Sequence, residues 1–112
     1  MKNINSLKTT KEFKEVYENG RVFSNRLLVM YILRKVGPLR IGICASRKVG
    51  NSVVRHRATR LIRESFLSLK SKIPENIAIV IVARPACAAG SEKEVERAFE
   101  DLLKAAWKDQ KW

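Results

Sequence analysis

Residues 47–63 read Arg-Lys-Val-Gly-Asn-Ser-Val-Val-Arg-His-Arg-Ala-Thr-Arg-Leu-Ile-Arg, and this stretch decides the fold. Asn51 and Ser52 follow a glycine and are both candidate N-caps, so a helix should begin at about Ser52. Apolar or small side chains then recur with the 3.6-residue spacing of a helix face packed on a core, at Val54, Ala58, Leu61, Ile62, Ser65, Phe66 and Leu69. The pattern predicts a helix over 52–69, and Pro74 ends it.

Upstream of this helix, the sequence predicts strands. Residues 27–33 and 40–46 are apolar runs rich in β-branched side chains, and Gly37-Pro38 between them marks a turn. We therefore expect these two runs to pair as an antiparallel hairpin. Residues 21–23 add a further short strand.

Two capping boxes mark the starts of two more helices. Thr9–Glu12 begins the first, which Gly20 ends, and this helix places Phe13, Val16 and Tyr17 on one face. Ser91–Glu94 begins the last helix, whose core stripe consists of Val95, Ala98, Phe99, Leu102, Leu103 and Ala106. Residues 77–83 are nearly all apolar, which predicts a strand buried at the centre of a sheet.

The order of elements is α-β-β-β-α-β-α, which predicts an α+β fold. We expect a two-layer sandwich, with helices packed on a four-stranded sheet, in a single domain spanning residues 1–112. Cys44 and Cys87 are far apart and form no CxxC, so we interpret both as small core residues. Neither a membrane-spanning run nor a signal-type segment occurs in the sequence, so we expect a cytoplasmic protein.

Positive charge is concentrated in the middle of the chain. The net charge is +12, and no acid occurs between Glu18 and Glu64, where a stretch of ordinary composition would hold about five. Eleven Lys or Arg lie in this interval. Because no acidic side chains offset these charges, the local positive field favours binding of a polyanion such as RNA.

The predicted helix over 52–69 carries much of this charge on its exposed side. His56, Arg57, Arg60 and Arg63 lie away from the apolar stripe, and Arg55 lies near its border. Arginine forks bind phosphate oxygens, and a helix start also favours an anion. A merely solvated basic face is the alternative interpretation.

This segment resembles the arginine-rich signature helix of the bacterial ribonuclease P protein family. The signature is roughly Lys-x-Gly-Asn-Ala-Val-x-Arg-Asn-Arg-x-Lys-Arg-x-x-Arg. It is matched here by Lys48, Gly50, Asn51, Val53, Arg55, Arg57, Arg60 and Arg63. Ser52, His56 and Thr59 depart from it, where the signature has Ala, Asn and Lys. The resemblance extends over nearly the whole chain.

The resemblance implies a fold similar to a ribosomal-protein domain and two RNA partners. Contacts with the ribonuclease P RNA would come from Lys48, Asn51, Arg55, His56, Arg57, Arg60 and Arg63. A cleft between the first helix and the sheet would hold the single-stranded 5′ leader of precursor tRNA, through Phe13, Tyr17, Tyr31, Arg47 and Arg84. Aromatic rings suit unpaired bases. Ordinary core packing remains an alternative, above all for Phe13.

The sequence does not predict a protein catalyst. Residues 19–63 contain no carboxylate, and His56, the one histidine, has no orienting acid near it in sequence. The resemblance implies that Mg²⁺ bound mainly by the RNA subunit performs the hydrolysis, with no metal bound by the protein alone. Other interpretations are a structural RNA-binding protein of ribosomal type, a protein-only nuclease and a binder of anionic membranes. The last is disfavoured because the basic helix lacks an aromatic insertion face.

Overall fold

A computed structural model describes residues 5–109. Its elements run α1 (Thr10–Asn19), β1 (Arg21–Ser24), β2 (Leu28–Arg34), β3 (Arg40–Cys44), α2 (Ser52–Leu69), β4 (Ile77–Ala83) and α3 (Glu92–Lys108). Two 3₁₀ turns, η1 (Lys70–Lys72) and η2 (Pro85–Ala89), flank β4. The predicted order of helices and strands and the α+β class are confirmed, and no helix in this part of the chain is long and apolar enough to span a bilayer.

The four strands form one mixed sheet in the order β1-β2-β4-β3. Strand β4 pairs antiparallel with β2 and parallel with β3, so it lies between them. The expected hairpin of residues 27–33 with 40–46 is therefore wrong. The reason is physical: β4 is apolar on both faces and fully buried over most of its length, which only an inner position in the sheet permits.

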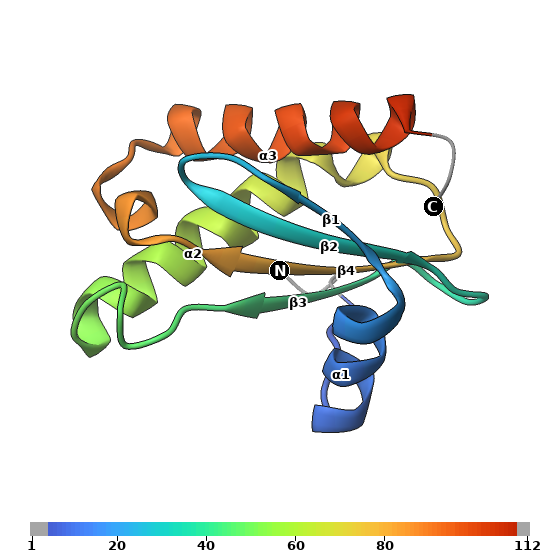
Figure 1. The fold of residues 1–112 in the computed structure, drawn as a ribbon. Helices are drawn as coiled ribbons and strands as arrows, with labels where there is room; N and C mark the ends of the chain where they lie inside the picture. The colour runs from blue at the N-terminus through green and yellow to red at the C-terminus, as the bar shows by residue number, and fades with distance from the viewer. Residues whose placement is uncertain (1–4, 110–112) are drawn as a thin grey trace.

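The sheet has a covered face and an open face (Figure 1). Helices α2 and α3 pack on one face, and their apolar stripes meet Leu28, Met30 and Ile32 of β2 in the main core. Helix α1 lies on part of the opposite face, where Val16 is buried against Val80. This opposite face, which α1 covers only in part, is called the open face below.

The predicted caps are all present. The Thr9 and Ser91 hydroxyls accept hydrogen bonds from the backbone N–H groups of Glu12 and Glu94, which complete the two capping boxes. At α2 the cap is Asn51, whose side chain accepts from the N–H of Val54. The helix therefore begins at Ser52 and ends at Leu69, as its sequence pattern predicts.

Candidate RNA-binding surfaces

The floor of the open face is apolar and half-buried. Strand register places Val29 of β2 opposite Val82 of β4, and Val82 beside Cys44 of β3. All three side chains are partly exposed, whereas the residues on either side of Val29 in β2 and of Val82 in β4 are buried on the helix-covered side. Cys44 is partly exposed but packs against the apolar cluster under α1, so our interpretation of it as a core residue holds only in part, while Cys87 is buried as expected.

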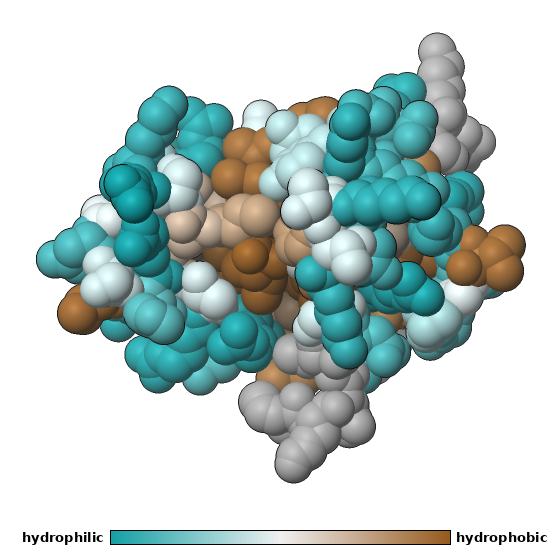
Figure 2. All heavy atoms as spheres, turned by 90° about the horizontal axis from the view of Figure 1, so that it is seen from below, coloured by the Kyte–Doolittle hydropathy of each residue, from teal (hydrophilic) through white to brown (hydrophobic). Residues whose placement is uncertain are grey.

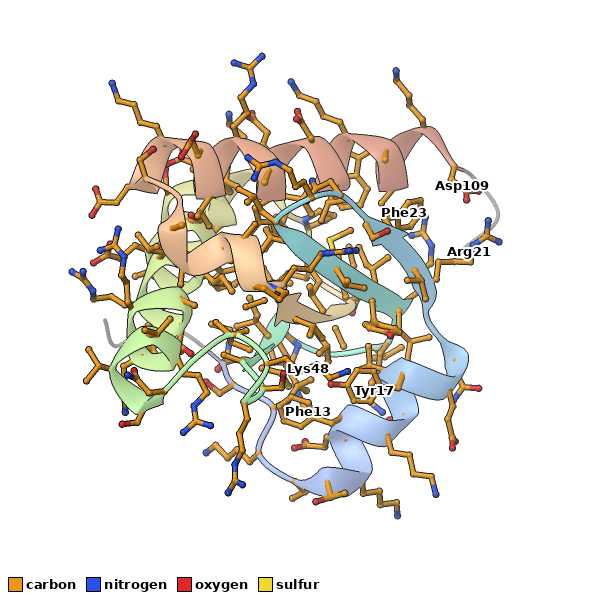
Figure 3. All side chains as sticks on the ribbon, turned by 60° about the vertical axis from the view of Figure 1, so that its left-hand side comes forward. Phe13, Tyr17, Arg21, Phe23, Lys48 and Asp109 are labelled. Carbon is orange, nitrogen blue, oxygen red and sulfur yellow. The ribbon has the colours of Figure 1, made fainter. Side chains whose placement is uncertain are left out.

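Aromatic side chains from α1 and β2 form a wall beside this floor. Phe13 and Tyr17 point from α1 toward the strands (Figure 3), and the ring of Tyr17 meets that of Tyr31 edge-on at 4.8 Å between centroids. Phe13 and Tyr31 are partly buried, and Tyr17 is 38% exposed. The structure therefore brings together the three aromatic residues that the sequence analysis named, with ring surface left accessible.

Tyr17 is held against the floor by its hydroxyl, which lies 3.3 Å from Cys44 Sγ. Partial burial raises the pKa of Tyr17 well above its usual range, and the contact with Cys44 adds to this shift. The hydroxyl therefore stays protonated at neutral pH, and no negative charge develops on the open face from this side chain.

Basic side chains gather at one end of the sheet. Strands β3 and β4 both end there, and β2 begins there, so three connecting segments meet at that edge. They carry the exposed side chains Arg26, Arg47, Lys48 and Arg84. Seen from the side of α1, an apolar strip crosses the molecule between hydrophilic margins (Figure 2). An apolar floor with a cationic edge suits a strand of unpaired nucleotides.

The loop before α2 needs the glycine of the basic segment. Gly50 has φ +151°, and a Cβ placed there would lie 2.8 Å from the Cβ of Val54. This close approach lets the chain turn from β3 into the helix, with Arg47 and Lys48 exposed on the loop. The glycine is therefore required by packing at the start of the basic helix.

The basic side chains of α2 divide between its two flanks. Arg55, His56 and Arg63 line a cavity on the flank near β3. On the opposite flank, Arg57 Nε donates to the carbonyl of Ala88 at 2.9 Å, and its Nη2 donates to that of Gly90 at 3.2 Å. The guanidinium group of Arg57, which we assigned to RNA binding, thus stabilises the turn before α3.

Arg60 lies on the outward crest of α2. It is exposed, and its Nη1 lies 3.9 Å from Glu64 Oε2 one turn on. An exposed pair at this distance contributes little to stability. Arg60 is therefore available to a phosphate, as predicted from its position on the helix.

The acids of α1 are engaged in ion pairs, with Glu12 bound to Arg40 and Glu15 to Lys35. Backbone N–H groups of Lys8 and Thr9 also lower the pKa of Glu12. Within residues 5–109, no three His, Cys, Asp or Glu side chains are grouped so that they could hold a metal ion.

Two residues of these surfaces were missed by the sequence analysis. Arg26 is one of the eleven basic residues between Glu18 and Glu64 but was not assigned to the site. Cys44 was assigned to the core because its neighbours in sequence are apolar. Both residues could have been assigned to the surface if β4 had been placed at the centre of the sheet, because this position brings the ends of three strands to one edge.

The family model for ribonuclease P matches residues 1–107. This chain belongs to the ribonuclease P protein family. The ribonuclease P protein component of Alkaliphilus metalliredigens is 42% identical over 105 residues, which are 93% of this chain and 95% of the relative. That of Lachnoclostridium phytofermentans is 45% identical over 100 residues, 88% of this chain and 86% of the relative.

Solved structures of ribonuclease P proteins have the same fold. The Staphylococcus aureus protein superposes with a TM-score of 0.82 at 30% identity and covers 93% of this chain and 96% of its own. The Thermotoga maritima protein is 24% identical and superposes with a TM-score of 0.80, covering 90% of this chain and 96% of its own. The α+β sandwich described above is therefore that of the ribonuclease P protein family.

Proposed function

We propose that this chain is the protein component of ribonuclease P and works with the RNA subunit to remove the 5′ leader of precursor tRNA in the cytoplasm. The single observation that supports this most is that a chain of this family combines the basic helix α2 with an open, aromatic face of the sheet. The ribonucleoprotein is the endoribonuclease. The protein contributes binding surfaces.

The RNA subunit would lie against α2 and the loop before it. Lys48, Arg60 and Arg63 are exposed, and the helix start adds N–H groups and a positive dipole end that favour phosphate. Lys48, Asn51, Arg55, His56, Arg57, Arg60 and Arg63 remain the proposed set. Within it, Asn51 also caps α2 and Arg57 also braces the turn before α3.

The 5′ leader would lie on the open face. Tyr17 and Tyr31 supply ring surface for stacking, and Phe13 lies on the same face of α1 as Tyr17. Arg47 and Arg84 supply charge at the sheet end. Stacking accepts any base, so little sequence preference is expected.

Hydrolysis would be carried out by Mg²⁺ held mainly by the RNA subunit, which activates water and stabilises the leaving oxygen. The role of this chain would be electrostatic and positional. Its arginines reduce the repulsion between two RNA molecules, and the open face holds the leader in line with the cleavage site.

Reconstitution tests the proposal against its alternatives. Adding the purified protein to ribonuclease P RNA at low Mg²⁺ should raise the rate of leader removal, and protein without RNA should not cut. A ribosomal-type protein would leave the rate unchanged. A protein-only nuclease would cut without RNA, and a point mutation in the protein would abolish that cutting.

Tyr31→Ala tests the leader surface separately. The holoenzyme with this variant should bind precursor tRNA more weakly by about 1–3 kcal/mol, which is the contribution of one stacked base. Its affinity for mature tRNA should not change. Circular dichroism checks that the variant is folded. Equal loss for both tRNAs would contradict the leader assignment.

A further inference from the structure

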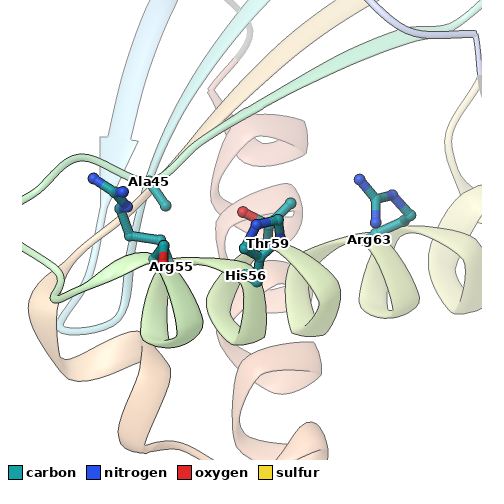
Figure 4. A pocket seen from close by; sticks show the side chains of 6 residues that line it. Ala45, Arg55, His56, Thr59 and Arg63 are labelled. Atoms are coloured by element: carbon teal, nitrogen blue, oxygen red, sulfur yellow. The ribbon is translucent and has the colours of Figure 1, made fainter.

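A cavity of about 240 Å³ lies along one flank of α2. Its lining consists of Ala45, Ser52, Arg55, His56, Thr59 and Arg63 (Figure 4). A second cavity of about 190 Å³ shares Thr59 and Arg63 with it and continues to Phe13 and Ile43. The two form one groove, which leads from the start of α2 toward α1.

The first of these cavities is cationic at both ends and polar between them. Arg55 and Arg63 are eight residues apart, which is about 12 Å along a helix. Their guanidinium groups stand at the two ends, with His56 and Thr59 between them (Figure 4). Because the two guanidinium groups stand apart in this arrangement, each can bind a different phosphate of the same strand. None of the lining residues is acidic.

The lining between the two arginines is polar. Ser52, His56 and Thr59 follow one another at spacings of four and three, so they form a single stripe on α2. Thr59 lies at the point that the two cavities share, and its short side chain leaves the groove open there.

We propose that this groove holds one unpaired nucleotide, with Arg55 and Arg63 on the phosphates at either side. Ser52, His56 and Thr59 hydrogen-bond to its base edge or 2′-hydroxyl, the groups that proteins read in single-stranded RNA. The nucleotide comes from the RNA subunit or from the precursor leader. The inference rests on the proposed placement of α2 against RNA and adds Ser52 and Thr59 as residues that determine specificity.

Thr59→Val tests the groove without changing its charge or volume greatly. Affinity for ribonuclease P RNA, measured by fluorescence anisotropy over a range of KCl concentrations, should fall about 3- to 10-fold, as for one lost hydrogen bond. The dependence on salt should not change, because no phosphate contact is lost. Ser68→Ala is the matched control, since it removes a hydroxyl from the other flank of α2 and should leave RNA affinity unchanged.

Two binding measurements with Thr59→Val identify the source of the nucleotide. Weaker binding of Thr59→Val to the RNA subunit alone assigns the nucleotide to that subunit. Unchanged binding there, with a 3- to 10-fold loss for precursor over mature tRNA in the holoenzyme, assigns it to the leader.

Arg63→Ala separates this inference from the proposed function. It should lower the slope of log affinity against log salt by about one contact. Suppose that Arg63→Ala lowers this slope while Thr59→Val changes neither binding to the RNA subunit nor binding of precursor tRNA. Then α2 contacts RNA but the groove holds no nucleotide, and the inference is wrong. If Arg63→Ala also changes nothing, the placement of α2 against RNA is itself wrong.

Discussion

At the scale of single residues, Gly42 explains how Phe13 reaches the sheet. A Cβ at Gly42 would lie 2.5 Å and 2.6 Å from two ring atoms of Phe13, so the ring packs directly on the backbone of β3. Phe13 is thus a packing residue that also lines the groove, and its contact with the leader stays a prediction.

Gly42→Ala should displace Phe13 and loosen α1. We expect the free energy of unfolding, measured in urea, to fall by about 1–3 kcal/mol, the usual cost of overpacking. Phe13→Leu in the same chain should recover part of this loss because the smaller side chain makes room for the methyl group. Purely additive losses in the double variant would contradict the proposed contact.

Arg57 and Arg60 differ in role although both carry the signature charge. Arg57→Lys cannot keep both bonds to the carbonyls of Ala88 and Gly90, so we expect the free energy of unfolding to fall by about 1 kcal/mol. The salt dependence of RNA binding should not change, because lysine keeps the charge. Arg60→Ala should do the reverse, weakening RNA binding and flattening its salt dependence by about one contact. Urea unfolding and a salt titration of both variants measure the contrast, and similar behaviour of the two would refute it.

At the scale of elements, the connection between β2 and β3 is shaped by the start of β4. Asn76 has φ +64°, and its backbone N–H donates to the carbonyl of Gly37 while its side chain accepts from the N–H of Gly37. Its carbonyl accepts from the N–H of Lys35. These bonds join the β2–β3 connection to the residue that precedes β4, so β4 begins between the two strands.

Asn76→Ala should therefore destabilise the sheet. It removes the side-chain bond and places a side chain without local hydrogen bonding in a left-handed conformation, which together cost about 1–3 kcal/mol. Asn76→Gly keeps the backbone conformation and should cost less. Urea unfolding compares the two variants, and an equal loss would show that the lost bond, not the backbone, sets the cost.

At the scale of the whole molecule, the two faces of the sheet differ in exposure. Helices α2 and α3 cover one face, whereas α1 covers the other only in part (Figure 1). The two cysteines mark these two sides, because Cys44 is on the open face and Cys87 is in the main core.

The thiols should therefore report separately on leader binding and on unfolding. Iodoacetamide should modify Cys44 in the native protein, and precursor tRNA in the holoenzyme should protect it while mature tRNA does not. Burial raises the pKa of Cys87 to about 11, so this thiol is protonated and inaccessible at pH 8 and should react only when the protein unfolds. Mass spectrometry of each site follows the reaction. Equal protection of Cys44 by both tRNAs would argue against leader binding at the open face.

The sequence alone determined the elements, because their signals are local. Caps and apolar periodicity act within a few residues, and they placed α2 at Ser52–Leu69 and the capping boxes at Thr9 and Ser91 correctly. The acid-free interval and the arginine spacing likewise predicted a basic helix surface, since charge and helical position are both read along the chain.

Only the tertiary structure decided which elements are neighbours. An apolar run indicates a strand but not its partner, so the turn at Gly37-Pro38 predicted a hairpin where β4 in fact lies between the two strands. The same limit applied to the arginines. Helical spacing put Arg57 and Arg63 on one exposed side, but Arg57 bonds carbonyls that follow β4 and Arg63 lines the groove near β3. Long-range packing assigns these roles because it depends on contacts between residues that are far apart in sequence.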